Sequence, residues 1–542
     1  MIKTGTFATP DNVSPSTLIM LERLNAASTT LETALDEYLE ACRVIRETYV
    51  DDQAINTIDH DLALGLAKQV PVIESLRQKL ELAKKLAGRS MNASSSLVPI
   101  HKLPSEILVR IFKLALSNNC HYHESQKIHV LTSICAYWRQ VACSSPALWT
   151  HIDLLVRIAP SLPPQFNHAK AYAKRAMPLP LEIHITDEYL PTGDISTTLA
   201  SFVASIAPRV ASLTINSRHP HHFQPTLSEL FNNCSPGVLK ALTTDILMGD
   251  TIFLNPEDAN QRRLDRRKWL GITSKERFNE VFLGITTLQL GSMYPSWASN
   301  AYHGLTELRL TRRGGCPNIA EFQLVMALRN SPGLRIFECA IQLTEEPWKL
   351  DGPINPVPLG DLEVVNLGEN EPADVEMIVR WLAPGPKPLQ LLVSDADFSA
   401  PCFTAFLSRS NITKVYTKEY GLEDMRVMRF VERLPNLQVM ALGRMIRIYD
   451  RGWAPKQPQY KVISSKLETL HVNYHCFTKS KTLREVVSLE SLRRVIFYSW
   501  EGPNQPLLSE LLQLNRRVEF EFLPWGMPSS VGEWDAITPG SF

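Results

Sequence analysis

From about residue 180 onward, the chain repeats a short pattern of the form apolar-x-x-apolar-x-apolar. Clear copies begin at Val210, Ile285, Leu305, Leu362, Leu437, Leu467 and Leu492, and looser copies begin at Leu239, Leu334, Leu389, Ile412 and Val518. From Leu305 on, successive copies start 23 to 30 residues apart. An interval of this length holds one short strand, one turn and one helix. The repeat therefore predicts stacked βα units.

Helical segments fall between the predicted strands. Apolar residues recur at helical spacing in NIAEFQLVMALR, ADVEMIVRWL, LEDMRVMRFVERL and QPLLSELLQL. Pro332, Pro384 and Pro435 follow three of these segments, where the chain must leave the helix. The region resembles a divergent leucine-rich repeat solenoid, although the usual loop asparagine is mostly absent. A doubly wound sheet of unrelated βα units is the alternative, and the steady spacing without a Gly-rich turn argues against it.

The pattern also predicts which way the strand side chains point. The apolar positions should face the core, and they include Leu308, Leu310, Val365, Leu367, Leu470 and Val472. The intervening positions should form a concave strand face, which is the predicted target-binding surface. Its candidates are Gln289, Glu307, Arg309, Arg335, Glu338, Glu363, Asn366, Glu468, His471, Arg493 and Arg494. Their mixed charges favour an acidic or mixed protein segment as the target, although such residues are also typical of an ordinary solvated surface.

A different pattern occupies residues 103 to 154. Leu103-Pro104 precedes a helix with apolar residues at helical spacing and with Glu106 near its positive end. After a polar joint at residues 117–129, a second apolar stripe predicts a second helix; it comprises Leu131, Ile134, Cys135, Trp138 and Ala142. Pro146, behind Ser144 or Ser145 as N-cap, predicts a short third helix that carries Trp149.

These residues resemble the F-box, as found in fungal F-box-like proteins. The shared features are Leu-Pro, an acidic residue, a run ending Ile-Phe, a Cys-x-x-Trp-Arg helix and a Leu-Trp; here they are Leu103, Pro104, Glu106, Ile111, Phe112, Cys135, Trp138, Arg139, Leu148 and Trp149. The resemblance implies docking to a Skp-type adaptor of a cullin-RING ubiquitin ligase. The implied adaptor-binding residues are Leu103, Pro104, Glu106, Ile107, Leu108, Ile111, Phe112 and Trp138. We expect Leu103, Pro104, Ile107, Ile111 and Phe112 to be exposed in the isolated chain.

Ahead of this module, residues 16 to 88 are predicted to be helical. One apolar seam runs from Leu21 to Tyr49, and a second follows from Ile58 to Ala83, with a bend or break near Pro71. An antiparallel helical hairpin is favoured, with an intermolecular coiled coil as the alternative. The polar residues 88–96 then serve as a linker.

The predicted fold class is α+β or an α/β repeat: a helical hairpin, a three-helix F-box and a leucine-rich-repeat-like βα solenoid. The predicted boundaries are a disordered N-terminus at 1–15, a hairpin or coiled-coil segment with its linker at 16–96, an F-box at 97–155, a solenoid at 156–523 and a C-terminal tail at 524–542.

Net charge, cysteine spacing and missing motifs limit the classes of function that the sequence predicts. The chain carries 56 Lys plus Arg against 56 Asp plus Glu, so no net field favours nucleic acid or a membrane. Nine scattered cysteines without a CxxC pair, and no apolar run of membrane-spanning length, indicate a cytoplasmic or nuclear protein. No nucleotide-binding, hydrolase or zinc-framework motif is present, so we predict no catalytic residue, no cofactor and no metal site.

Two further features, a basic run and several histidines, have simple structural explanations. The basic run QRRLDRRKWL, centred on Arg266, is a basic contact loop, a nuclear-import patch or, more simply, a solvated helix face. The histidines at 121, 123, 219, 221 and 222 lack neighbouring ligands at metal-binding spacing.

The chain is thus predicted to be a non-catalytic substrate receptor of a ubiquitin ligase, with an unidentified protein target. A structural scaffold that keeps an F-box without joining a ligase is the main alternative.

Overall fold

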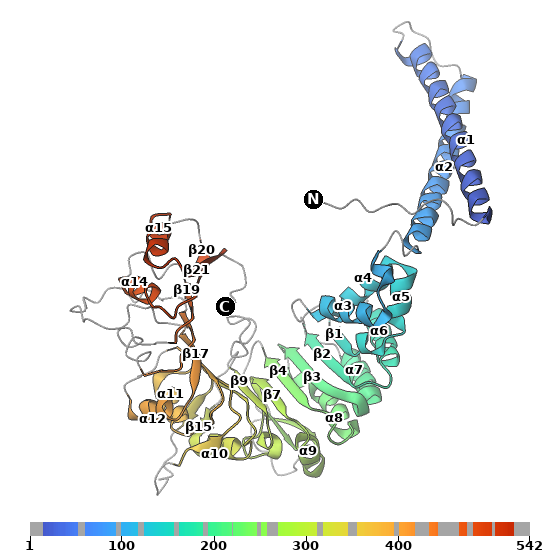
Figure 1. Ribbon diagram of the computed structural model, residues 1–542. Coiled ribbons are helices and arrows are strands. Elements are labelled where there is room, and N and C mark those ends of the chain that lie inside the picture. Colours follow the sequence, from blue (N-terminus) through green and yellow to red (C-terminus); the bar gives the residue numbers. More distant parts are fainter. Residues whose placement is uncertain are drawn as a thin grey trace. The chain divides into compact units, whose positions relative to one another are not determined.

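The computed structural model is shown in Figure 1. It describes residues 15–51, 60–93, 99–117, 124–156, 162–187, 193–218, 220–246, 251–256, 269–311, 318–344, 355–394, 400–417, 433–442, 466–473, 481–500 and 505–524. The predicted disordered N-terminus and C-terminal tail lie almost entirely outside these residues. The chain divides into two compact units, Met1–Lys102 and Leu103–Phe542.

The first unit is built on two long helices. They are α1 (Pro15–Arg46), which continues into the π-helical turn η2 (Glu47–Asp51), and α2 (His60–Ala93); the short 3₁₀ helix η3 (Pro99–Lys102) follows. The two helices run side by side (Figure 1), and the Tyr38 hydroxyl lies 3.4 Å from the side-chain oxygen of Gln69. Helix α2 continues through Pro71 and beyond residue 88, so the break expected at Pro71 is absent and the linker is shorter than predicted.

The second unit begins with small helices. They are α3 (Ser105–Ser117), α4 (Glu124–Ile134), α5 (Ala136–Cys143) and the 3₁₀ helix η4 (Pro146–Leu148). The single helix expected across the second apolar stripe is wrong, because the backbone of Cys135 is extended at φ −155° and ψ 169°. The Cys135 sulfur accepts a hydrogen bond from the Trp138 N–H and so caps α5. Part of the predicted polar joint is helical, since α4 starts at Glu124.

A 14-stranded, all-parallel sheet follows, with its strands in chain order. The strands are β1 (His151–Val156), β2 (Leu181–Asp187), β3 (Val210–Ser217), β4 (Ala241–Ile246), β7 (Thr287–Gly291), β9 (Glu307–Thr311), β11 (Ile336–Cys339), β14 (Val364–Leu367), β16 (Leu389–Val393), β17 (Ile412–Thr417), β18 (Val439–Leu442), β19 (Thr469–Asn473), β20 (Arg494–Trp500) and β21 (Glu519–Pro524). This arrangement confirms the predicted succession of βα units and is consistent with a leucine-rich-repeat-like solenoid.

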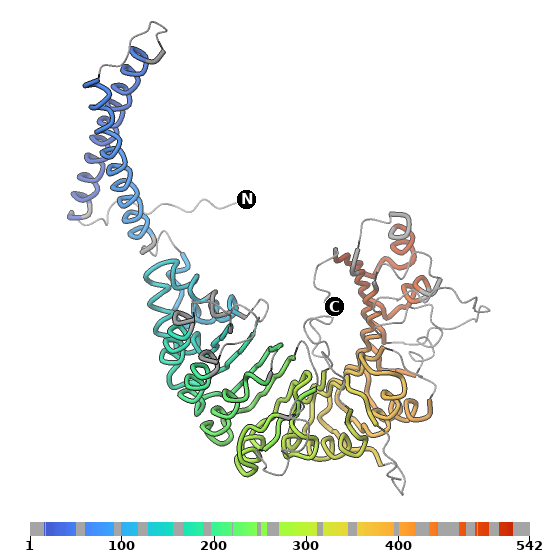
Figure 2. The backbone as a smooth tube through the Cα atoms, turned by 180° about the vertical axis from the view of Figure 1, so that it is seen from behind, coloured from blue at the N-terminus to red at the C-terminus, as the bar shows by residue number. Residues whose placement is uncertain are grey.

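Helices alternate with these strands. They are α6 (Leu162–Arg175), α7 (Gly193–Ile206), α8 (Gln224–Asn233), α9 (Lys275–Phe282), α10 (Glu321–Arg329), α11 (Pro372–Val379), α12 (Pro401–Ser408), α14 (Lys481–Val487) and α15 (Gln505–Leu514), with 3₁₀ turns η5 (Ala207–Arg209), η6 (Pro220–Phe223) and η8 (Asn300–Tyr302). Figures 1 and 2 show α6 to α10 on one side of the sheet. The core therefore lies between this helical layer and one face of the sheet.

Short parallel strands form three smaller sheets in the connections. They are β5 (Ile252–Pro256), β6 (Trp269–Thr273) and β8 (Met293–Pro295) in one sheet, β10 (Asn318–Ala320) with β12 (Gln342–Thr344), and β13 (Val357–Leu359) with β15 (Leu382–Pro384). β5 and β6 lie in the long interval between Leu239 and Ile285, and β8 follows that interval. The basic residues of that interval, Arg262 to Lys268, lie outside the described residues.

The strand register agrees with the sequence pattern. Every strand from β3 to β21 in the large sheet begins within two residues of a pattern copy. The six apolar positions predicted to face the core are all buried. However, the sheet starts one strand before the predicted solenoid at 156–523, because β1 lies almost entirely within the residues assigned to the F-box and pairs with β2. The prediction identified no copy of the pattern at either β1 or β2.

Candidate functional site

Helix α3 presents an apolar face to solvent. Ile107 is 44% exposed and Ile111 is 37% exposed, and Leu114 is more exposed than either. The three residues are spaced four and three positions apart, so they lie along one face of the helix. Val130 and Ile134 of α4 are also exposed and lie four positions apart. Apolar surface of this kind, on helices of so small a module, is typical of a binding site.

The remaining adaptor-binding candidates differ in their exposure. Pro104 and Glu106 are exposed, and Leu103 and Trp138 are half-buried. Leu108 and Phe112 are buried, so the expectation that Phe112 is exposed is wrong. The Phe112 ring packs against Trp138, with 4.8 Å between the ring centroids, because both side chains help to join α3 to α5. Leu108 and Phe112 therefore hold the helices together, whereas Ile107 and Ile111 face outward.

The outward positions of the large sheet line up in rows. One row, which we call the central row, crosses all fourteen strands through paired residues: Asp153, His184, Thr214, Thr243, Gln289, Arg309, Glu338, Asn366, Leu392, Tyr416, Ala441, His471, Ile496 and Glu521. Its members are polar from β1 to β14, and four successive members from β16 to β19 include three apolar residues. The central row is thus polar over its first part, from β1 to β14, and mainly apolar from β16 to β18.

A buried apolar cluster lies on the later part of the strand face. It consists of Val364, Leu392, Tyr416 and Ala441, with Ile336 packed against it. Burial raises the pKa of the Tyr416 hydroxyl. Next in the central row, His471 is also buried, and this burial, together with the positive charges of Arg494 and Lys414, lowers its pKa to about 4. His471 was predicted to lie on the accessible strand face, and the structure places it on that face but largely shielded from solvent.

Arg309 lies at the centre of a buried polar group on β9 and β11. It is only 8% exposed, and its guanidinium lies 2.5 Å from Glu307 and 3.0 Å from Glu338. Gln289 donates a 2.8 Å hydrogen bond to Glu307. Burial acts to lower the pKa of Arg309, but the hydrogen bond to Glu307 and the two negative charges outweigh it and raise that pKa. Asn366 is similarly buried, so Arg309 and Asn366 are less accessible than the sequence suggested.

Glu338 is buried as well, as His471 is, whereas the other target-binding candidates remain at least partly accessible. Arg335 pairs with Glu363 at 2.7 Å, and Lys387 lies 3.3 Å from the same carboxylate. The hydrogen bond from Arg335 is the largest cause that lowers the pKa of Glu363. Arg493 is exposed, and Arg494 pairs with Glu521 at 2.5 Å. Exposed charges of both signs therefore border the more buried central row.

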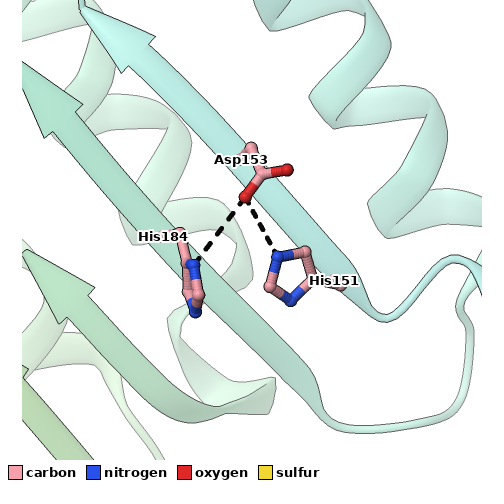
Figure 3. Close-up of side chains that lie close together, drawn as sticks. All are labelled: His151, Asp153 and His184. Carbon is pink, nitrogen blue, oxygen red and sulfur yellow. Dashed lines mark hydrogen bonds and ion pairs between the residues drawn. The ribbon is translucent and has the colours of Figure 1, made fainter. Parts of the chain in front are cut away.

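Among the described residues, one group of side chains could hold a metal ion, and it comprises His151, Asp153 and His184 (Figure 3). The sequence predicted no metal site here, because His151-x-Asp153 and Glu182-x-His184 are 31 residues apart. The pairing of β1 with β2 brings them together. The signal that could have found the group is the alternation of these residues in two successive strands. Of the histidines considered earlier, His221 and His222 are exposed in η6, and residues 121, 123 and 219 lie outside the described residues.

A cavity of about 680 Å³ lies beside the N-terminus of α9. Its lining includes Asn255, Lys275, Glu276 and Asn300, of which Lys275 and Glu276 are charged. Among the described residues that line it there is no histidine or cysteine, and Glu276 is the one carboxylate.

Comparison with protein families adds one finding. A model of the F-box-like family matches residues 100–155, which span α3 to α5, η4 and most of β1. No curated protein matches the chain. None of the described helices is both long enough and apolar enough to cross a membrane. F-box proteins are generally non-catalytic adaptors, and in this chain an F-box-like domain is followed by a long, all-parallel sheet consistent with a leucine-rich-repeat-like solenoid.

Proposed function

We propose that this chain is the substrate-recognition subunit of a cullin-RING ubiquitin ligase. The observation that carries the proposal is the exposed apolar face of α3 within a domain that matches the F-box-like family. In this role, the F-box-like domain binds a Skp-type adaptor and the strand face of the solenoid holds a protein target. We place this activity in the cytoplasm or the nucleus.

Proximity is sufficient for such a subunit to act. Holding a lysine of the target near a separate ubiquitin-charged enzyme raises the effective concentration of the two reacting groups, and the receptor supplies no catalytic group.

Placing negative charges on the exposed apolar face of α3 tests the first half of the proposal. Ile107→Asp with Ile111→Asp is expected to weaken adaptor binding at least about 100-fold, because burying each isoleucine contributes roughly 1.5 to 3 kcal/mol. Both side chains point to solvent, so the fold should be retained. The measurement is calorimetric titration of the full chain with a purified Skp-type adaptor, with circular dichroism to check folding.

A matched control uses the same substitution on another exposed apolar pair. Phe322 and Met326 of α10 are 44% and 49% exposed and lie four positions apart. Phe322→Asp with Met326→Asp should leave adaptor binding unchanged. If the wild-type chain does not bind the adaptor, the chain is better described as an interaction scaffold outside the ligase.

Target binding is proposed for the exposed charges that border the central row. Arg335→Glu with Arg493→Glu is expected to remove partners captured by the wild-type chain, because both arginines are exposed beside the strand face. Arg309 is unsuitable for this test, since a glutamate there would add a third carboxylate to Glu307 and Glu338. The measurement is quantitative proximity labelling in cells that express either form.

Arg77→Glu with Arg484→Glu is the charge-matched control. Both arginines are exposed and ion-paired, as Arg335 is, and they lie on helices α2 and α14. An identical partner set for the wild type and the Arg335/Arg493 variant, with folding intact, would move the target site away from the strand face.

A further inference from the structure

His151, Asp153 and His184 form a compact group at the start of the large sheet. Asp153 is paired with His184 in the register of β1 and β2, and His151 occupies the outward position two residues before Asp153. Figure 3 shows both imidazole rings directed toward the Asp153 carboxylate. The side chains are 14% to 18% exposed, so the group is shielded but not sealed.

We propose that these three side chains bind a zinc ion. The His151 Nε2 and His184 Nδ1 atoms lie 3.0 Å and 3.8 Å from the same oxygen of Asp153, and all three ligand atoms lie within 4.8 Å of one another. Tetrahedral zinc with bonds of about 2.0 to 2.2 Å places its ligand atoms about 3.4 Å apart. The observed distances bracket this value, so small side-chain rotations are enough to close the site.

The ligand types favour zinc over magnesium, calcium and copper(I). Two imidazoles suit a borderline transition ion, whereas magnesium and calcium prefer oxygen ligands and copper(I) prefers thiolate or thioether sulfur. Three protein ligands leave the fourth tetrahedral position for a water molecule. The partial exposure of the three side chains gives that position access to solvent.

Glu182 is placed to orient His151. One of its carboxylate oxygens lies 3.6 Å from the His151 Nδ1, the ring nitrogen that the proposed metal does not use. The interaction with His151 is the largest cause that lowers the pKa of Glu182. A carboxylate at Nδ1 favours the tautomer with its proton on Nδ1, which leaves the Nε2 lone pair for zinc.

The position of the site indicates what the metal does. β1 follows Trp149 of the F-box-like domain after a single residue, and β2 is the next strand of the sheet. Zinc would bind two side chains from β1 and one from β2. It would thus fasten the strand that leaves the helical domain to the first unit of the solenoid.

Metal titration of the full chain tests this proposal. After dialysis against a chelator, the wild-type chain is expected to bind one zinc ion, measured by competition with a chromophoric chelator. Cobalt(II) should bind at the same site and give the intense visible absorption of a tetrahedral ion. His151→Gln with His184→Gln should abolish both signals and should leave circular dichroism unchanged.

The control removes another close histidine pair. The rings of His129 and His168 are 5.1 Å apart, and both side chains are exposed. His129→Gln with His168→Gln should bind zinc as the wild type does. Glu182→Gln is expected to bind zinc about 10- to 100-fold more weakly while keeping the cobalt spectrum, because it removes an orienting group and no ligand.

Three results would overturn the zinc site. The first is a wild-type chain that takes up no stoichiometric zinc. The second is cobalt absorption typical of octahedral, water-rich coordination. The third is equal zinc affinity in the wild type and the His151/His184 variant. The first two use only the wild-type chain, so they decide the question even if a variant fails to fold.

Discussion

Replacing Trp149 with alanine is expected to lower the free energy of unfolding of the F-box-like domain by about 3 to 5 kcal/mol. The side chain is completely buried, and its indole N–H donates a 2.7 Å hydrogen bond to the carbonyl oxygen of Ala142. Its ring meets Tyr172 edge-on, with 4.9 Å between centroids, and the guanidinium of Arg175 lies 4.3 Å from the ring centre. Because Tyr172 and Arg175 belong to α6, the substitution should loosen both the small helices and the first βα unit.

Trp149→Phe is the matched control. It keeps an aromatic ring in the site and loses the indole hydrogen bond, but the Ala142 oxygen still accepts from the Ser145 N–H at 3.2 Å. A cost of about 1 to 2 kcal/mol is expected. Hydrogen-exchange mass spectrometry of residues 105–156 measures the local free energy of opening without assuming that the whole chain unfolds in one step. Wild-type protection in the alanine variant would contradict this role.

The repeat pattern predicted the strands well because burial and register depend on the same apolar positions. Leu308 and Leu310 had to face the core for their strand to contribute to it, and both are buried. The first two strands were missed for other reasons. The pattern does occur at Trp149, in WTHIDL, but these residues were assigned to the F-box, and before LEIHITD the first apolar position of the pattern is a proline, Pro178 or Pro180.

The candidate sites depend on contacts that no local pattern contains. Cys135 continues the apolar stripe of a helix, yet its extended backbone starts a new helix because its sulfur caps the Trp138 N–H. Phe112 belongs to the F-box pattern, but the pattern does not separate the outward face of α3 from its packed face. Arg309 reads as a surface residue until the carboxylates of its own and the next strand are placed around it.

Arg309 is the second position where a large effect is expected. Arg309→Met should lower the free energy of unfolding by about 3 to 5 kcal/mol, because it leaves the buried Glu338 carboxylate without its positive partner. Most of this cost comes from the unpaired carboxylate, not from the lost attraction. Arg309→Met combined with Glu338→Leu should therefore be much more stable than the single variant, and this double variant is the control.

The pH dependence of the single variant separates this explanation from simple loss of packing. In Arg309→Met, the pKa of Glu338 in the folded state should rise above its unfolded value of about 4.3, since the carboxylate is buried and has lost the guanidinium. A raised folded-state pKa means that the folded chain binds more protons than the unfolded chain between the two pKa values. Stability therefore falls as pH increases through that window. The free energy of unfolding of Arg309→Met should therefore come closest to that of the wild type at acidic pH. The comparison applies at pH values where protonation of other carboxylates has not yet unfolded either chain.

Urea unfolding of the three chains at several pH values, followed by hydrogen exchange in β9 and β11, provides the measurement. A single variant whose deficit relative to the wild type is constant with pH, and which the added Glu338→Leu substitution does not relieve, would show that Arg309 acts through its aliphatic packing. The expected result is a deficit that changes with pH and that Glu338→Leu relieves, and it would show that Arg309 acts through its charge. A strand face of this kind keeps fixed ion pairs in its centre, which leaves the exposed charges of Arg335, Glu363 and Arg493 at its border to meet a partner.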